Sequence, residues 1–286
     1  MKIYKNYDKT TLDYQYNTRL QVPDFANYFE GWEARSEEIR KQYAFRRNAH
    51  YGNHPRERLD IFPSSLPASK TLIFIHGGYW QKLDKDLFHF IATAFVPYHI
   101  TTVFITYPLA PEASMDEIVI SCRNAVQWVQ SNISQYNGDP NELYIAGHSA
   151  GGHLATMMMS KEWSGIEMIK GVCAISGLFN LLPIQLSELN EVLHMDEETA
   201  VRNSPVRWQP LISCPVIVAV GDEESDEFKE QGEELYNCWN KIVSVQLLKL
   251  PGINHYSIAD EFGRKNSLLH VTMLKMMGID LDSFQL

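Results

Sequence analysis

The stretch that decides the fold is Leu143-Tyr144-Ile145-Ala146-Gly147-His148-Ser149-Ala150-Gly151-Gly152-His153-Leu154. An apolar run typical of a strand leads into a Gly-x-Ser-x-Gly turn, and a run typical of a helix follows. In that context the motif marks a nucleophile elbow. The glycines on either side of Ser149 are needed because side chains there would collide with neighbouring chain in so sharp a turn. A five-residue match alone is weak, since a glycine-flanked serine also occurs in ordinary turns.

A second motif lies upstream of the elbow. Residues 71–75 form an apolar, β-branched run that ends in His76-Gly77-Gly78-Tyr79-Trp80. A strand that runs into His-Gly-Gly can present backbone N–H groups to an oxyanion. We expect an oxyanion hole made by the N–H groups near Gly78 and Tyr79 and by that of Ala150, which begins the helix after the nucleophile. The two motifs together favour an acyl-transfer site.

Composition and charge limit the class of protein. The chain has 286 residues, 45% of them hydrophobic and 21% charged, with a formal net charge of −10. This length and composition fit one large α/β domain, residues 1–286, with a substantial core. The negative charge disfavours nucleic acid and anionic membranes as partners, which leaves a small-molecule substrate. The oligomeric state stays open, a homodimer included.

The compartment is inferred from two patterns. The residues after Met1 lack the apolar region of a signal peptide, and no apolar run is long enough to span a membrane. No Cys-x-x-Cys pair occurs among the cysteines, which are Cys122, Cys173, Cys214 and Cys238. We therefore expect a reduced, cytoplasmic protein.

Strand and helix patterns alternate along the chain. Strand-like runs lie at 58–62, 71–75, 101–106, 143–146, 171–175, 215–220 and 243–250, and helix patterns at 85–95, 114–134, 150–159, 226–240 and 261–277. This alternation predicts an α/β fold with a doubly wound, mostly parallel sheet. Residues 1–48 form an N-terminal arm with a helix over 26–42. Residues 179–208 are too many for a structureless loop, so we expect a short helical cap over the site.

The base that activates Ser149 should follow it, because the order in this architecture is Ser, acid, His. The candidates are His153, His194, His255 and His270. Three of them lie in the elbow helix, in the cap and within the last helix. His255 instead follows the last strand and Pro251-Gly252, at the carboxyl end of the sheet, where a base can reach Ser149. We expect His255 to be the base.

The acid that orients the base should follow the strand at 215–220, where acidic residues crowd the turn Gly221-Asp222-Glu223-Glu224-Ser225-Asp226-Glu227-Phe228. Asp222 is closer to the strand end, and Glu224 has the longer reach. Any of these acids could also be a surface charge or could interact with a helix N-terminus. Spacing alone does not choose between Asp222 and Glu224.

These motifs resemble the α/β-hydrolase family of kynurenine formamidases (arylformamidases) and their bacterial esterase relatives. The likeness covers most of the chain, at residues 16–23 in the arm, 58–63, 76–80 as a His-Gly-Gly-x-Trp element, 147–154 as the elbow, and the loop of His255. The resemblance implies an α/β-hydrolase fold with a helical cap. It also implies a serine hydrolase that cleaves an aryl formamide such as N-formylkynurenine, or a short-chain or aryl ester.

The resemblance also selects the acid. The family's acid loop reads roughly Asp-Ser-Pro-Glu-Phe followed by a Gln, and Glu224-Ser225-Asp226-Glu227-Phe228 with Gln231 lines up with it. Glu224 is thereby implied as the acid, a glutamate where the eukaryotic enzymes carry aspartate. A second departure is Tyr256, which follows His255 where the family usually has Phe.

The expected chemistry needs no cofactor and no metal, and the histidines show no His-Glu-x-x-His pattern. Trp80, Phe179 and Tyr256 adjoin the oxyanion loop, the cap and the base, so we expect them to bind a small planar substrate. Packing in the core is an equally good interpretation of Trp80. The alternative function is a non-catalytic ligand-binding protein on a hydrolase scaffold. Such proteins usually lack a triad member, whereas here a serine, a histidine and an acid are all present.

Overall fold

The computed structural model describes residues 1–160, 163 and 166–283. Within these ranges one eight-stranded sheet has the order β1-β2-β4-β3-β5-β6-β7-β8. β1 and β2 pair antiparallel with each other and β2 pairs antiparallel with β4, whereas β3 to β8 pair in parallel. The strands are β1 (Arg46–His50), β2 (Arg58–Phe62), β3 (Ser69–Ile75), β4 (Thr101–Ile105), β5 (Gly138–His148), β6 (Ile169–Ile175), β7 (Val216–Gly221) and β8 (Val245–Leu250).

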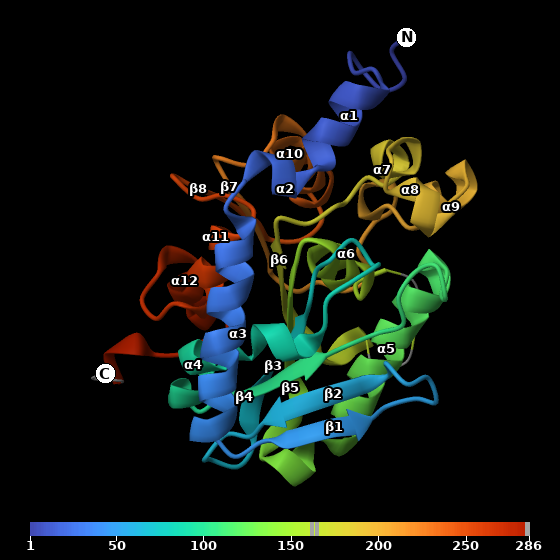
Figure 1. The fold of residues 1–286 in the computed structure, drawn as a ribbon. Helices are drawn as coiled ribbons and strands as arrows, with labels where there is room; N and C mark the ends of the chain where they lie inside the picture. The colour runs from blue at the N-terminus through green and yellow to red at the C-terminus, as the bar shows by residue number, and fades with distance from the viewer. Residues whose placement is uncertain (161–162, 164–165, 284–286) are drawn as a thin grey trace.

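Helices cover both faces of this sheet (Figure 1). The α-helices are α1 (Lys9–Tyr16), α2 (Thr18–Gln21), α3 (Phe25–Gln42), α4 (Ala92–Phe95), α5 (Met115–Asn132), α6 (Ala150–Met157), α7 (Leu182–Leu186), α8 (Asn190–Leu193), α9 (Glu197–Arg202), α10 (Asp226–Trp239), α11 (Ser257–Gly263) and α12 (Leu268–Met276). The 3-10 helices are η1 (Lys85–Ile91), η2 (Val96–Tyr98), η3 (Ile133–Tyr136), η4 (Ile166–Met168), η5 (Pro205–Arg207) and η6 (Leu281–Ser283). Among the described residues, no helix combines the length and apolar character that crossing a bilayer requires.

The continuous apolar runs become central strands because both faces of the sheet are buried. In β3, Ile73 and Ile75 point into the core beneath α5, α6 and α10. Leu72 and Phe74 point into the opposite core, beneath α3, η1, α11 and α12. The four successive apolar residues of β3 therefore pack alternately into the cores on the two faces of the sheet. The doubly wound, mostly parallel sheet expected from the sequence is confirmed.

The structure differs from the predicted elements in three places. The edge strand β1 was not expected, because Arg46–His50 has little apolar character and only Ala49 is buried. The helix expected at 85–95 is the 3-10 helix η1 followed by α4, and that expected at 261–277 is divided into α11 and α12. Residues 179–208 contain α7, α8, α9 and η5, as short helices.

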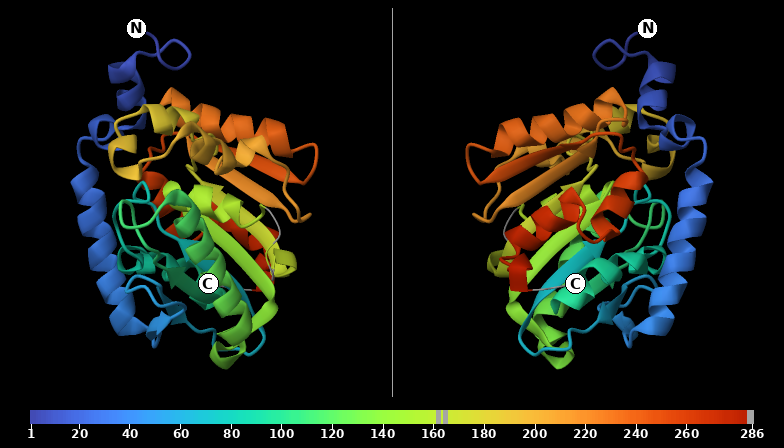
Figure 2. Two further views of the ribbon diagram at one scale, coloured as in Figure 1. Left: turned by 90° about the vertical axis from the view of Figure 1, so that its right-hand side faces the viewer. Right: turned by 90° about the vertical axis from the view of Figure 1, so that its left-hand side faces the viewer.

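The N-terminal arm is ordered against the body of the protein. Figure 2 shows α3 running along one side of the molecule, and Figure 1 places α1 and α2 beside α10. Trp32 of α3 is 1% exposed and lies against the rings of Phe88 and Phe90, with centroid distances of 5.4 and 5.8 Å. Ser36 Oγ donates to the Leu87 carbonyl. The arm is thus fastened to η1, directly after the His-Gly-Gly loop.

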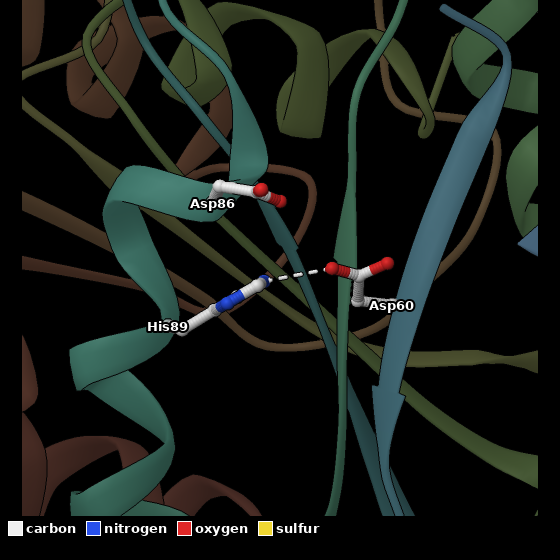
Figure 3. Close-up of side chains that lie close together, drawn as sticks. All are labelled: Asp60, Asp86 and His89. Atoms are coloured by element: carbon white, nitrogen blue, oxygen red, sulfur yellow. Dashed lines mark ion pairs between the residues drawn. The ribbon is translucent and has the colours of Figure 1, made fainter. Parts of the chain in front are cut away.

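A buried ionic cluster holds η1 to β2 (Figure 3). Asp60 Oδ2 lies 3.1 Å from His89 Nε2 and 3.2 Å from Lys85 Nζ, and Lys85 Nζ lies 2.8 Å from Asp86 Oδ1. Asp60, Asp86 and His89 have the chemistry of metal ligands. The ammonium group of Lys85 already contacts both carboxylates, however, so it supplies the positive charge in this cluster.

Asp60→Asn should lower the free energy of unfolding by about 3 kcal/mol, because Lys85 would stay buried with only part of its compensating charge. Urea denaturation measures this change. Asp24→Asn is the matched control, since Asp24 is exposed and its side chain caps no helix. We expect that control to shift stability by less than ~0.5 kcal/mol. Equal, small shifts for the two variants would contradict a structural role for Asp60.

Candidate active site

Ser149 occupies the turn between β5 and α6, with φ 58° and ψ −121°. Its N–H donates to the Ile175 carbonyl at 2.8 Å. A Cβ atom at Gly147 would stand 2.1 Å from the Gly151 carbonyl oxygen, and one at Gly151 would stand 2.0 Å from that of Ile75. Both positions therefore require glycine. The geometry is that of a strained strand-to-helix elbow.

His255 lies in the loop after β8, and its Nε2 is 3.1 Å from Ser149 Oγ. The loop is held on one side by Asn254 Oδ1, which accepts from the N–H groups of Tyr256 and Ser257 at 2.9 Å. On the other side, His148 Nε2 donates to the His255 carbonyl at 2.8 Å. The elbow residue next to the serine thus positions the loop of the base, a role that sequence reasoning did not assign to His148.

Of the two candidate acids, Glu224 is the one in contact with the imidazole. Its Oε2 lies 2.7 Å from His255 Nδ1, and its Oε1 accepts from Ser176 Oγ at 2.6 Å and from the Gly221 N–H at 2.8 Å. Asp222 is exposed, and its Oδ1 accepts from the Gly252 N–H at 2.6 Å. Asp222 therefore ties the end of β7 to the turn after β8, at a site separate from the imidazole.

The His-Gly-Gly loop passes directly beside the serine. A Cβ atom at Gly77 would stand 3.0 Å from Ser149 Cβ. Gly78 and Tyr79 both have positive φ, 105° and 51°, and within the described ranges neither N–H donates a hydrogen bond. Ala150 is the first residue of α6, so its N–H has no acceptor within the helix. The His-Gly-Gly loop and the start of α6 therefore each offer backbone N–H groups that are free to donate to a ligand.

A pocket of about 230 Å³ opens over Ser149. Beside the serine it is lined by the His-Gly-Gly loop and by Tyr256 of the base loop. The N-terminal arm adds six lining residues, which are Tyr16, Asn17, Thr18, Arg19, Phe29 and Trp32. Residues 179–208, expected as a cap, contribute Glu188 and Leu189. Sequence reasoning missed this role of the arm, and the only signal for it was the family resemblance at residues 16–23.

Two hydrogen bonds fasten the arm to the site. The Tyr79 hydroxyl donates to the Tyr16 carbonyl at 2.5 Å, and Thr18 Oγ1 lies 2.9 Å from the Tyr256 hydroxyl. The first bond reaches the His-Gly-Gly loop and the second reaches the residue after His255. The part of the N-terminal arm that lines the pocket is therefore hydrogen-bonded both to the His-Gly-Gly loop and to the loop that carries His255.

Two aromatic residues assigned to the substrate from the sequence lie elsewhere. Trp80 is fully buried, and its Nε1 donates to His153 Nδ1 at 3.2 Å. Phe179 is also fully buried, and its N–H donates to Gln231 Oε1 at 2.7 Å. Neither lines the pocket, whereas Tyr79 and Tyr256 do. The left-handed backbone at Tyr79 and Trp80 sends one ring to the pocket and the next into the core, which corrects the expectation for Trp80.

The fold and this site define an α/β-hydrolase. The chain is similar to a candidate thioesterase from Silicibacter sp. TM1040, with a TM-score of 0.81 and 28% identity over 91% of this chain and 97% of the other. A family model described as BD-FAE matches residues 59–180.

Sequence comparison identifies the family. Kynurenine formamidase of Danio rerio is 34% identical over 97% of this chain and 99% of its own length. Kynurenine formamidase of Salmo salar is 36% identical, with 81% of both chains covered. The chain belongs to the kynurenine formamidase family. It is a hydrolase, and its relatives support formamide or ester hydrolysis.

Three buried histidines around the site should make the fold sensitive to acid. Burial lowers the pKa of His76 and His153 to about 4 and that of His148 to about 3, so all three are neutral in the folded protein. Below the usual histidine pKa of about 6.5, the unfolded chain binds more protons than the folded chain does. Stability should therefore fall as the pH is lowered from about 6.5 toward 4, by up to ~1.4 kcal/mol per pH unit for each histidine.

Urea denaturation at a series of pH values measures this slope. His153→Gln should make the slope shallower, while His50→Gln, at an exposed position at the end of β1, should leave it unchanged. A slope that is the same in wild type and in His153→Gln would show that buried histidine protonation does not control the acid sensitivity.

Proposed function

We propose that this protein is a serine hydrolase that cleaves a small aryl formamide, with N-formylkynurenine as the first candidate. The observation that carries the proposal is the continuous chain of contacts from Glu224 Oε2 through His255 to Ser149 Oγ, at distances of 2.7 and 3.1 Å. This arrangement matches the geometric requirements for an activated nucleophile, with a base in reach of the hydroxyl and an acid on the far nitrogen of the imidazole.

In the acylation step, Ser149 Oγ attacks the formyl carbon as its proton passes to His255 Nε2. Negative charge develops on the formyl oxygen, where the N–H groups of Gly78, Tyr79 and Ala150 are proposed to donate. One such donor typically stabilises the transition state by about 3 kcal/mol. The C–N bond then breaks, and the proton on His255 moves to the departing amine. The product of this step is a formyl ester on Ser149.

In the second step, water attacks the formyl ester while His255 accepts its proton. The proton returns from His255 to Ser149 Oγ as formic acid leaves, and formic acid then ionises to formate in water. In both steps Glu224 holds the proton on Nδ1 and offsets the positive charge that forms on the imidazole. Because its other oxygen is held by Ser176 and Gly221, the carboxylate is oriented before the substrate binds.

The shape of the pocket supports a small acyl group and a planar leaving group. Ser149 is 3% exposed and Ala150 is fully buried, so the reacting hydroxyl lies at a buried position, which favours a small acyl group. The leaving group would lie in the arm-lined part, where aromatic rings favour a planar molecule: Tyr16, Phe29, Trp32, Tyr79, Phe88 and Tyr256. The alternative substrate class is a short-chain or aryl ester, since ester and formamide cleavage use the same triad and oxyanion contacts.

We also infer that the reaction takes place in the cytoplasm. The cysteines Cys122, Cys173, Cys214 and Cys238 are free, as is usual in a reducing compartment. The net charge of −10 argues against nucleic acid as a partner. A homodimer stays a prediction that a measurement of mass in solution can test.

The substrate is tested by comparing kcat/KM for N-formylkynurenine with the values for p-nitrophenyl acetate and p-nitrophenyl butyrate. We expect the formamide to exceed both esters by at least about tenfold, because the aromatic pocket binds its leaving group. Cleavage of the esters alone would replace the formamidase proposal with an esterase. Binding of N-formylkynurenine without turnover of any compound would favour the non-catalytic alternative.

The acid assignment is tested by a matched pair. Glu224→Gln should keep the shape of the site and lower kcat by about 10³- to 10⁴-fold, because the amide no longer fixes the imidazole tautomer. Asp222→Asn should change kcat by less than about threefold. Ser149→Ala supplies the baseline, and Ser149→Ala combined with His255→Ala should be hardly slower, since triad members act as a unit. A larger loss for Asp222→Asn than for Glu224→Gln would reverse the assignment.

A further inference from the structure

Two positively charged side chains line the pocket without an acidic partner. Arg19 comes from α2, and Lys82 follows the His-Gly-Gly loop. In the described part of the chain, neither forms an ion pair with a carboxylate, and the polar partner of Arg19 is the neutral side chain of Tyr256. Glu188 also lines the pocket, but its carboxylate accepts from Asn17 Nδ2 at 3.5 Å and reaches neither cation. The charged side chains that line the pocket therefore carry an excess of positive charge.

The two cations are close enough to influence one another. Partial burial lowers the pKa of Lys82, and the nearby guanidinium of Arg19 lowers it further. Like charges held together raise the free energy of the empty pocket, and an anion bound between them would relieve that repulsion. Arg19 also stacks on Phe25, with its guanidinium carbon 4.9 Å from the ring centroid, which limits the directions it can take.

Both cations are attached to segments that build the reacting centre. The Lys82 N–H donates to the Gly78 carbonyl at 3.1 Å, so its backbone belongs to the His-Gly-Gly turn. Arg19 adjoins Thr18, whose hydroxyl contacts the Tyr256 hydroxyl. Their backbone positions relative to Ser149 are therefore set by the same contacts that form the site.

We infer that Arg19 and Lys82 form a carboxylate-binding subsite, so that the substrate carries a carboxylate on its leaving group. This inference rests on the proposed hydrolase function. In this proposal the leaving group occupies the part of the pocket that the arm lines, and its far end meets Arg19 and Lys82. Arginine suits this task because its planar guanidinium can donate two parallel hydrogen bonds to one carboxylate.

The test compares substrates that differ only in charge, N-formylkynurenine and its methyl ester. Wild type should have a kcat/KM about 10- to 100-fold higher for the acid, the size expected for charge-assisted hydrogen bonds. Arg19→Met should remove most of that preference, chiefly through KM for the acid, and leave the methyl ester within about threefold. Lys82→Met should act in the same direction with a smaller effect. Glu188→Gln should lower KM for the acid, since it removes a repelling charge.

Arg46→Met is the matched control, because Arg46 is an exposed arginine on the edge strand β1, outside the pocket. It should leave the preference unchanged. Equal losses for the acid and the methyl ester in Arg19→Met would overturn the subsite and leave the arm a purely structural role. A wild-type enzyme without preference for the acid would overturn it too.

The subsite and the formamidase proposal can fail separately. If wild type cleaves p-nitrophenyl acetate and no formamide, the formamidase proposal is wrong. The same charge comparison is then made with acetylsalicylate and its methyl ester, which differ by one carboxylate on the leaving group. Loss of the preference for acetylsalicylate in Arg19→Met would support the subsite in an esterase, and an unchanged preference would reject it.

Discussion

The site depends on how closely the ends of β3 and β5 approach one another. Ile75 pairs with Gly147 in the parallel register, which brings the His-Gly-Gly loop beside the elbow. A Cβ atom at Gly151 would stand 2.0 Å from the Ile75 carbonyl oxygen, so α6 can begin only if this residue is glycine. That contact brings the N–H groups of two separate segments to one side of Ser149. The proposed oxyanion loop and nucleophile are thus positioned by strand pairing rather than by the substrate.

The proposed acid, Glu224, is held by several hydrogen bonds on the other side of the imidazole. Glu224 reaches back from the turn after β7 to bind His255, while Ser176 at the end of β6 holds its second oxygen. The carboxyl ends of β5 to β8 therefore converge on one hydrogen-bonded network, as expected for a doubly wound sheet. Asp222 instead accepts from the Gly252 N–H, so its exposed carboxylate is engaged away from the imidazole.

Sequence patterns were informative where a local rule determines the structure. The apolar runs predicted the central strands because a strand buried on both faces must be apolar, and chain order together with the loop after β8 singled out His255, which lies beside Ser149. The choice between Asp222 and Glu224 required the family resemblance, because spacing does not reveal which carboxylate turns inward. Trp80 and Phe179 show the same limit of sequence reasoning. Their aromatic side chains indicate burial, but the sequence does not reveal whether they pack in the core or line the pocket. Contacts between Thr18 and Tyr256 join distant segments, and no local pattern encodes them.

Chemistry and specificity come from different parts of this chain. The proposed triad and oxyanion loop follow the ends of sheet strands and could act on many acyl compounds, so they do not define the substrate. Part of the pocket in which we propose that the leaving group binds is lined by the N-terminal arm, which lies outside the matched BD-FAE segment of residues 59–180. Since Tyr16 and Thr18 connect that arm to the oxyanion and base loops, a change in the arm can alter both recognition and reactivity. Relatives that share the elbow but differ in the arm should therefore differ in substrate while keeping the same reaction steps.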